Sequence, residues 1–582
     1  MSFTPPTPID AALPLTERIR RAYERIADVD RPEVWITLRT QQDALADALE
    51  IDRRYEAGEQ LPLRGVLVAV KDNIDVAGLP TTAGCPEYAR VAERSAVAVQ
   101  RLTAAGAIIL GKTNLDQFAT GLVGTRSPYG AVRCAWDSER VSGGSSSGSA
   151  TAVALGIADI ALGTDTAGSG RVPAALNGLV GIKPTLGLIP AAGVVPACVD
   201  YDAVTVFGHD LELAARAVAI MAGGSEEDPR SRVAPSDVPL SAGLAPRLAI
   251  PRDEDLAQLA PEYAEAFART VAGLVDSGLS LEAVDISPLL NAATLLYDGA
   301  IVAQRYAAVG EFLETRPAGA DPTVAGIVLA ARKPSAHAYV DDLDALAEAK
   351  SYARRLMASF DALLLPTTTE HPTIAAVQAE PVDINRRMGT FTNFCNLLDM
   401  AAVAVPGQPT ATGHPFGVMV VTVAFHDEVA LEIAGRICGA PSSSGIISGH
   451  ELFVVGAHLR GEPLYEQLTR RGARYVGEVT TSDAYRLVVL DTVPLKPGLV
   501  RHGDGAGAPI AGELYELSAS HLATLLAELP YPMALGAVEL ADGRTVTGFS
   551  CALEAAVAGT DITEYGGWKA YLAHAADVQS GQ

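Results

Sequence analysis

The sequence predicts an α/β fold, a sheet covered by helices on both faces, followed by a smaller, β-rich α+β domain. Two observations lead to this prediction. Between residues 63 and 165, short apolar runs typical of strands alternate with segments of helical apolar spacing. Beyond residue 445 the pattern changes to short strand-like segments separated by β-turn signals, including Asp542–Gly543.

The first domain is expected to begin with helices, because apolar residues recur at i, i+3 and i+4 within residues 12–60. Residues 254–360 are mostly helical in pattern and rich in alanine. The remaining predicted elements are strands at 63–72, 107–114, 157–165, 361–368 and 414–425, and helices at 95–106 and 147–156.

The segment GAPSSSGIISG (439–449) has the serine, glycine and proline content of a linker. We therefore assign residues 1–440 to the first domain, residues 441–450 to a linker, and residues 451–582 to the second domain.

The 582 residues carry a formal net charge of −25, and 49% of them are hydrophobic. This charge argues against nucleic acid and against an anionic membrane surface, since both would repel the chain. The N-terminus lacks the basic and apolar regions of a signal peptide, and the longest apolar segment (151–163) is interrupted by Asp159. The six cysteines show no paired spacing. We therefore expect a soluble, cytoplasmic protein.

Two glycine–serine loops and one lysine are the candidate catalytic elements. The loops are SGGSSSGSA (142–150) and GTDTAGSGR (163–171), and Lys71 ends the hydrophobic run in GVLVAVKDN (65–73). A lysine acts as a base near neutral pH only when its pKa falls well below about 10.4, and burial lowers it. A buried lysine and two serines in glycine turns can form a hydrolytic triad without histidine. Taken singly, a solvated surface lysine and plain turns are the ordinary alternatives.

The second loop also offers a site for an oxyanion. Four consecutive backbone amides are expected to point into one concavity, which suits a developing negative charge. These are the amides of Thr166, Ala167, Gly168 and Ser169.

Together these segments resemble the amidase signature family over about residues 60–440. The segments that carry the resemblance are VAVKDN, GKTNLDQFATG, SGGSSSGSA, GTDTAGSGRVPAALNGLVGIKPT, TNFCNLLDMAAVAVPG and PFGVMV. The resemblance implies a mixed central sheet covered by helices. It also implies that Ser169 is the nucleophile that becomes acylated, that Ser145 is the bridging serine, often preceded by a cis peptide bond, and that Lys71 is the general base.

The same resemblance implies that Gly121 and Gly124 are substrate-binding residues. Small departures from the common family pattern, at Ser147, Ala167 and Gly170, resemble the allophanate hydrolases, which cleave the terminal amide of allophanate in urea breakdown. The alternatives are an amidase of another small carboxylated amide, with malonamate and biuret as the candidates, and an inactive scaffold.

Allophanate carries a carboxylate, so its site needs a fixed cation. The apolar periodicity of residues 294–313 predicts one helix, around which Tyr297 and Arg305 project about 80° apart. An arginine binds a carboxylate in bidentate fashion and a tyrosine hydroxyl adds a further bond. This pair resembles the substrate clamp of allophanate hydrolases. Arg171 is the competitor, for which we expect a loop-bracing role.

The second domain resembles γ-glutamyl cyclotransferase-like domains at LFVVGAHLRGEPL (452–464) and GELYEL (512–517). His458 lies in the loop that would line a cavity. In allophanate hydrolases the second domain is linked to decarboxylation of the product N-carboxycarbamate, and His458 is the candidate proton donor. A structural histidine, and a domain that only mediates assembly, are the alternatives.

No metal-ligand spacing or nucleotide-binding motif is evident, so neither a metal nor an organic cofactor is expected. The resemblance implies a biotin-dependent urea carboxylase as the pathway partner. That enzyme is expected on a separate chain, because this one has no biotin-attachment MKM motif. The alanine-rich helices are compatible with a homodimer.

Overall fold

The computed structural model describes residues 7–440, 445–503, 505 and 507–580. Its contacts divide the chain into two compact units. Unit 1 comprises Met1–Val233 and Pro246–Ile446, and unit 2 comprises Ala234–Ala245 and Ile447–Gln582. The domain boundaries assigned above stay a prediction, and residues 441–444 of the expected linker lie outside the described residues.

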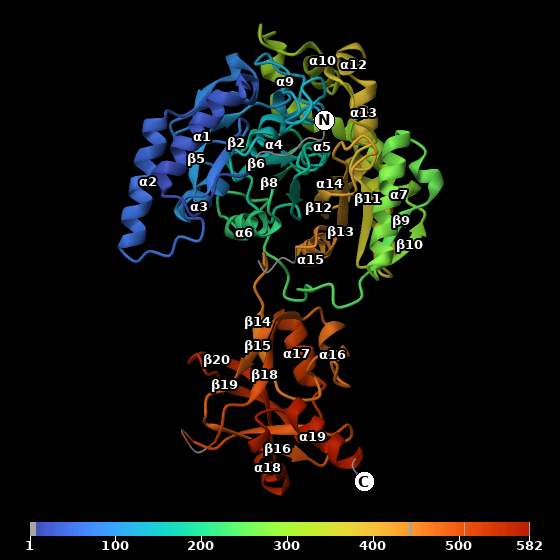
Figure 1. Cartoon of the computed structure of the whole chain (residues 1–582). Helices are drawn as coiled ribbons and strands as arrows, with labels where there is room; N and C mark the ends of the chain where they lie inside the picture. Colours follow the sequence, from blue (N-terminus) through green and yellow to red (C-terminus); the bar gives the residue numbers. More distant parts are fainter. Residues whose placement is uncertain (1–6, 441–444, 504, 506, 581–582) are drawn as a thin grey trace. The chain divides into compact units, whose positions relative to one another are not determined.

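Unit 1 is built on one large mixed sheet, which confirms the predicted α/β class (Figure 1). The strand order is β1-β5-β2-β6-β8-β7-β12-β13-β11-β9-β10. In that order the strands are β1 (Trp35–Leu38), β5 (Ile108–Thr113), β2 (Leu67–Lys71), β6 (Ile160–Asp165), β8 (Ala203–Gly208), β7 (Val180–Lys183), β12 (Met400–Pro406), β13 (Gly417–Val423), β11 (Ala362–Pro366), β9 (Arg247–Pro251) and β10 (Ser280–Val284). A short separate pair is formed by β3 (Pro80–Thr81) and β4 (Arg90–Val91).

The centre of this sheet is buried on both faces, as the continuous apolar runs of its strands require. Every residue of β2, β5, β6 and β8 is buried. Strands β5, β2 and β6 are mutually parallel, so their carboxyl ends meet at one edge of the sheet. In open α/β sheets that edge is where ligands bind.

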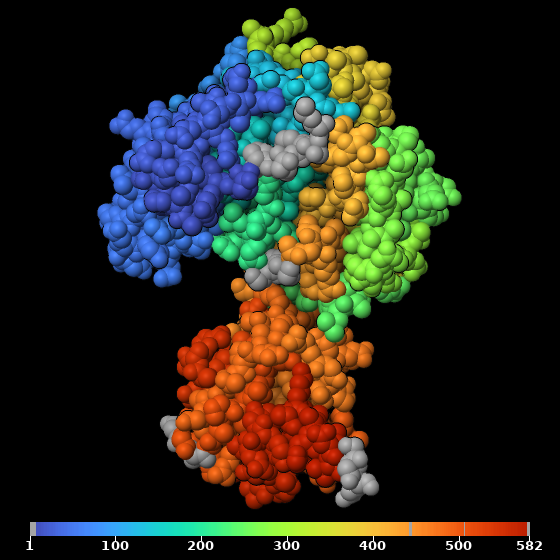
Figure 2. Space-filling model, in the orientation of Figure 1, coloured from blue at the N-terminus to red at the C-terminus, as the bar shows by residue number. Residues whose placement is uncertain are grey.

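Helices cover the sheet and its two ends. Helices α1 and α2 lie at the β1 end, and α7 lies with β9 and β10 at the other end (Figures 1 and 2). The helices of unit 1 are α1 (Leu15–Val29), α2 (Gln41–Glu56), α3 (Val97–Ala104), α4 (Ser147–Ala154), α5 (Val172–Asn177), α6 (Leu211–Met221), α7 (Pro261–Asp276), α8 (Ser287–Thr294), α9 (Ala303–Glu314), α10 (Pro322–Ala330), α11 (Ala336–Met357), α12 (Ile374–Ala379), α13 (Asp383–Met388), α14 (Asn393–Leu397) and α15 (Asp427–Cys438).

The prediction of one helix over residues 294–313 is wrong. Helix α8 ends at Thr294, and α9 begins at Ala303 after a 3₁₀ turn at Ala300–Val302. The chain is extended at Gly299, where a Cβ would come within 2.4 Å of the Asp342 carboxylate. That carboxylate accepts the amides of Ala300 and Ile301 and so holds the start of the 3₁₀ turn through a tertiary contact, which the local periodicity does not contain.

Unit 2 is β-rich, as predicted. One sheet has the order β15-β18-β14-β20-β19 and another the order β17-β16-β21. The strands are β14 (His450–Val454), β15 (Arg474–Thr480), β16 (Tyr485–Leu490), β17 (Lys496–Arg501), β18 (Ala511–Leu517), β19 (Met533–Glu539), β20 (Thr545–Cys551) and β21 (Thr560–Asp561), and the helices are α16 (Glu466–Thr469), α17 (Ala519–Ala527), α18 (Leu553–Ala558) and α19 (Trp568–Ser580).

A short segment from the middle of the sequence completes unit 2. Residues 234–245 follow α6 in the chain but pack on the second unit. The amide of Leu240 donates to the carbonyl of Gly472 at 2.8 Å, and the carbonyl of Ser236 accepts the amide of Ser520 at 2.8 Å. No local pattern in this loop predicts that pairing.

Candidate active site

Lys71 is the last residue of β2, and its amine is enclosed by hydroxyl groups. Its Nζ lies 2.8 Å from Ser145 Oγ and 2.8 Å from Thr164 Oγ1. The side chain is fully buried. Thr164 belongs to β6, the parallel neighbour of β2, so the shared edge of the two strands brings the hydroxyl to the amine.

Burial lowers the pKa of Lys71 to about 7. Removal from water disfavours the charged ammonium, whereas the carboxylates of Asp116, Asp202 and Asp165 partly oppose the shift. A lysine in this state is substantially neutral at pH 7 and can accept a proton.

Ser145 lies in the loop before α4, and the Gly144–Ser145 peptide bond is cis. The loop is anchored by Asp116, whose amide donates to the Ser145 carbonyl at 3.1 Å. A Cβ at residue 144 would come within 2.1 Å of Asp116 Oδ2, so this position requires glycine. The Asp116 carboxylate also accepts the amides of Gly124 and Arg126, both at 2.9 Å, and thereby holds the adjoining turn.

Ser169 completes a row of three side chains. It lies in the turn after β6, with its Oγ 3.0 Å from Ser145 Oγ and 3.5 Å from the carbonyl oxygen of Gly121. Lys71, Ser145 and Ser169 are therefore joined through consecutive hydrogen-bond distances. A base, a bridging hydroxyl and a terminal hydroxyl in one row are the requirements for an activated serine nucleophile.

The turn that carries Ser169 is held by a buried ion pair between Asp165 and Arg171. Their side chains are fully buried and lie 2.9 Å apart. Arg171 also donates to the carbonyl of Thr392 and to Asn396 Oδ1, each at 3.1 Å. Its guanidinium is thus engaged within the protein, in agreement with the expected bracing role.

Two of the expected backbone roles need correction. The prediction that four amides face one concavity is wrong at Gly168, because this N–H donates to Asp165 Oδ1 at 2.9 Å. The buried carboxylate of Asp165 requires donors, and the turn supplies one of them. The amides of Thr166, Ala167 and Ser169 stay a prediction.

Gly124 does not offer its backbone to a ligand. Its N–H donates to Asp116, and its carbonyl accepts the amide of Val132 at 2.9 Å. A Cβ there would come within 2.7 Å of the Gly143 carbonyl, so the glycine permits close packing of two loops. Gly121, whose carbonyl faces Ser169, stays a candidate for contact with substrate.

Arg305 is a buried cation without a carboxylate partner among the described residues, and it is only 1% exposed. Its Nη2 lies 3.1 Å from the Tyr297 hydroxyl, and its Nη1 donates to Thr120 Oγ1 at 2.9 Å. Thr120 adjoins Gly121, which contacts Ser169. The predicted convergence of Tyr297 and Arg305 is therefore present, although the two residues lie on separate elements. Tyr297 also lines a largely apolar cavity of about 870 Å³.

Three polar partners of the site were missed by sequence reasoning: Thr164, Thr120 and Asp116. Each lies within a segment already singled out as motif-bearing, GTDTAGSGR or GKTNLDQFATG. Their presence in these segments was the available signal, but the partner of each side chain depends on which segments are neighbours in space.

His458 belongs to unit 2 and has its own surroundings. Its Nε2 lies 2.9 Å from Gln467 Oε1, and its ring stacks on Phe549 with centroids 4.6 Å apart. Burial lowers its pKa, and the charges of Lys496 and Arg471 add to this, whereas the Gln467 contact opposes it.

Within the described part of the chain, no three His, Cys, Asp or Glu side chains are arranged to hold a metal ion. The described helices include none with both the length and the apolar character needed to cross a membrane.

Comparison with known families assigns both regions of the chain. Residues 17–431 match the amidase family, and residues 450–573 match the family described as the allophanate hydrolase C-terminal domain.

Individual relatives cover different shares of the chain. The urea amidolyase of Saccharomyces cerevisiae is 42% identical over 94% of this chain, which spans only 31% of that protein. The urea amidolyase of Lachancea kluyveri is also 42% identical, over 92% of this chain and 31% of its own length. The structure of Kluyveromyces lactis allophanate hydrolase is similar with a TM-score of 0.85, at 38% identity and over 97% of both chains.

The Asp165–Arg171 pair predicts a stability effect. Arg171→Met leaves the Asp165 carboxylate buried and unpaired, which is expected to lower the free energy of unfolding of unit 1 by about 3–5 kcal/mol. Urea unfolding of the full chain measures the change. Arg94→Met is the matched control, since Arg94 is 70% exposed, and its effect should stay below about 0.5 kcal/mol. Equal effects of the two variants would contradict the bracing role.

Proposed function

The chain belongs to the amidase family, and from that premise we propose that it hydrolyses allophanate (urea-1-carboxylate) at its terminal amide and releases ammonia. As a member of that family it is an amidohydrolase. Both family matches and the similarity to the Kluyveromyces lactis allophanate hydrolase over nearly the whole chain support the proposal.

The catalytic roles are proposed from the row of three side chains. Ser169 Oγ attacks the terminal carbonyl carbon, and its proton passes through Ser145 Oγ to the neutral amine of Lys71. The two hydroxyl hydrogens can rotate, so Ser169 can donate its hydrogen bond to Ser145, and Ser145 can donate to Lys71. The same proton then returns through Ser145 to the leaving nitrogen, which departs as ammonia.

A covalent intermediate remains on Ser169 after ammonia leaves. Water, activated by the same lysine and serine, hydrolyses this acyl-enzyme and releases N-carboxycarbamate. The amides of Thr166, Ala167 and Ser169 are the candidate donors to the oxyanion in both steps.

Arg305 is the observation that favours allophanate over an uncharged amide. Burying a guanidinium without an anionic partner is costly, and a substrate carboxylate would supply that partner. The Tyr297 hydroxyl, 3.1 Å from the guanidinium, can donate to the same carboxylate. Thr120 and Gly121 connect this cation to the nucleophile.

The second candidate function is hydrolysis of malonamate, which has the same carboxylate and a methylene in place of the central nitrogen. Biuret has no carboxylate and cannot use Arg305 in this way, so the geometry favours it less. Measuring kcat/KM of the purified chain for allophanate, malonamate and biuret ranks the three candidate substrates.

We also propose that unit 2 assists the decarboxylation of N-carboxycarbamate, with His458 as proton donor. The surroundings of His458 support the assignment, because its ring lines a cavity. A urea carboxylase on a separate chain as the supplier of allophanate, a cytoplasmic location and a homodimer also belong to the proposal. The match to part of the longer urea amidolyases supports the link to urea.

The pKa of Lys71 predicts the acid limb of the pH profile. Protonated Lys71 cannot accept the proton of Ser145, so kcat/KM should fall about tenfold per unit below pH 7 and level off above it. Initial rates of ammonia release between pH 5.5 and 9, corrected for uncatalysed decay, test this. A profile that stays flat to pH 5.5 would show that Lys71 is not the base.

Arg305→Met should raise KM for allophanate by about 10- to 100-fold, because a charge-assisted contact is worth about 1.5–3 kcal/mol. The change should be absent for biuret, which has no carboxylate. Arg332→Met is the control, since Arg332 is 68% exposed and remote in sequence from the motifs. An unchanged KM for allophanate in a folded Arg305→Met protein would remove the clamp from the proposal.

His458→Asn should cause N-carboxycarbamate to accumulate during turnover, because the proton needed at nitrogen is then supplied only by water. Carbon-13 NMR of labelled allophanate during the reaction detects it. His502→Asn, at an exposed position of the same unit, provides the comparison. Identical time courses for the two variants would leave unit 2 without a chemical role.

A further inference from the structure

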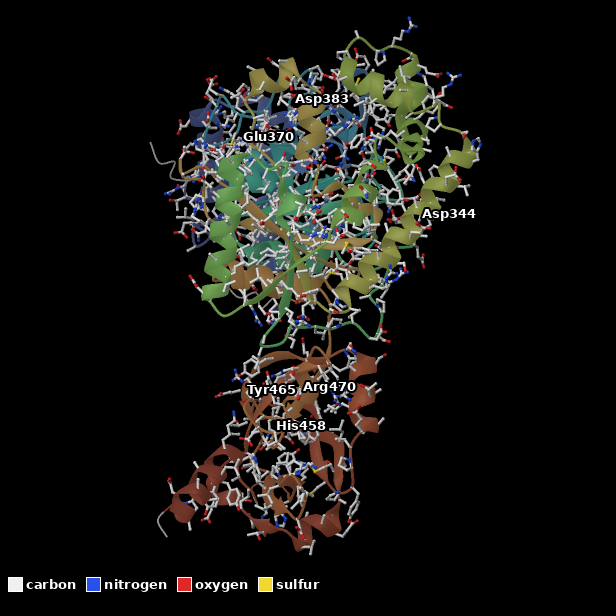
Figure 3. All side chains as sticks on the ribbon, turned by 90° about the vertical axis from the view of Figure 1, so that its right-hand side faces the viewer. Asp344, Glu370, Asp383, His458, Tyr465 and Arg470 are labelled. Carbon is white, nitrogen blue, oxygen red and sulfur yellow. The ribbon has the colours of Figure 1, made fainter. Side chains whose placement is uncertain are left out.

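Unit 2 contains a small cavity beside His458 whose lining is chemically uneven. It has a volume of about 160 Å³ and is lined by His458, Gln467, Lys496, Glu528 and Phe549, with the remaining wall mostly apolar. In Figure 3, His458 is labelled in the same region as Tyr465 and Arg470, which flank α16. A space of this size accommodates a molecule of a few heavy atoms.

Lys496 supplies an unbalanced positive charge to this cavity. It is the first residue of β17, is only 7% exposed, and has no hydrogen-bond or ion-pair partner among the described residues. Its backbone register in the sheet, opposite Leu490, does not require a charged side chain. A buried ammonium that lacks an anion within the protein favours binding one from solution.

The other charges at the cavity do not neutralise Lys496. The carboxylate of Glu528 is paired with Arg471 at 2.7 Å and with Arg470 at 2.6 Å. Two guanidinium groups therefore balance the one acid of the lining. The cavity as a whole is positive, in a chain whose net charge is −25.

We infer that this cavity is a binding site for a small dicarboxylate-type anion and that Lys496 is its cationic ligand. The inference rests on the second step proposed above, for which N-carboxycarbamate, with two carboxylates on one nitrogen, is the matching ligand. Lys496 holds the carboxylate that is retained, and His458 faces the nitrogen from which the other one leaves.

The bound anion also controls when the imidazole carries a proton. In the empty cavity, burial and the charges of Lys496 and Arg471 disfavour the imidazolium. A dianion placed between Lys496 and His458 reverses the sign of the local potential and favours it. Because Nε2 is held by Gln467, the proton available for transfer is on Nδ1.

The chemical step then balances without a further reactant. The bond from nitrogen to one carboxyl carbon breaks, its electron pair stays on nitrogen, and the Nδ1 proton joins that pair. The products are carbon dioxide and carbamate, and His458 regains its proton from water. Lys496 neutralises one charge of the dianion throughout and is a binding residue in this scheme.

Binding of malonate tests the site directly, because malonate replaces the central nitrogen of N-carboxycarbamate with a methylene and does not react. The full chain is used in an Arg305→Met background, which removes the anion site of unit 1. Isothermal titration calorimetry should detect one site, and Lys496→Met should raise its Kd at least about tenfold. Lys496→Arg, which retains the charge, should keep the Kd within about threefold.

Lys569→Met is the matched control, since Lys569 is a half-exposed lysine of the same unit that pairs with Glu513. Its malonate Kd should not change. Titrations in buffers of different ionisation enthalpy should also show proton uptake near pH 7, and His458→Asn should abolish it. Absence of malonate binding, or an equal Kd in Lys496→Met and the parent, would overturn the inference.

These outcomes are separable from failure of the proposed function. Malonate binding is measured without turnover, so an inactive chain that still binds through Lys496 retains the anion site. A chain that releases ammonia from allophanate but shows the same malonate Kd with and without Lys496 retains the hydrolytic step and loses the site proposed here.

Discussion

The candidate active site depends on keeping one buried amine out of direct contact with carboxylates. Successive side chains of a strand point to opposite faces, so Lys71 and Asp72 diverge at the end of β2. Asp72 instead pairs with the buried Lys112 of β5 at 2.9 Å. Lys71 meets only the hydroxyls of Ser145 and Thr164, so burial can lower its pKa to about 7. With Asp72 on the same face, the ammonium would be stabilised and the pKa of Lys71 would not fall in this way.

Four of the buried cations differ in whether the protein pairs them with a carboxylate. Lys112 and Arg171 are buried and paired with carboxylates of the protein. Arg305 and Lys496 are also buried, but each faces polar or open surroundings without an internal anion among the described residues. An unpaired buried cation is unfavourable in the empty protein and becomes favourable when an anion binds. Each unit thus contains one buried cation of this kind, Arg305 in unit 1 and Lys496 in unit 2. Such cations are suited to bind the consecutive anions of the proposed reaction sequence.

The parts of the site that were predictable lie in continuous motifs. Lys71, Ser145 and Ser169 each lie at a strand end or in a glycine turn, where local residue types restrict the backbone. Contacts that arise between distant segments were not predictable in this way. The amide of Gly168 was expected to face an oxyanion, yet it is taken by Asp165. Likewise, periodicity alone could not reveal that Asp342 holds a 3₁₀ turn at Ala300–Val302, within the helix expected across residues 294–313.

By itself, the sequence determined the α/β class, the β-rich second region, the three residues of the hydrogen-bonded row and the pairing of Tyr297 with Arg305. Only the tertiary structure decided which buried charges are neutralised by an ion pair within the protein. Arg171 and Arg305 are both arginines near apolar segments, but the first forms an ion pair with Asp165, whereas the second forms none within the described chain. The physical reason is that the free energy of a buried charge is set by its neighbours in space, which the strand order brings together from segments far apart in sequence.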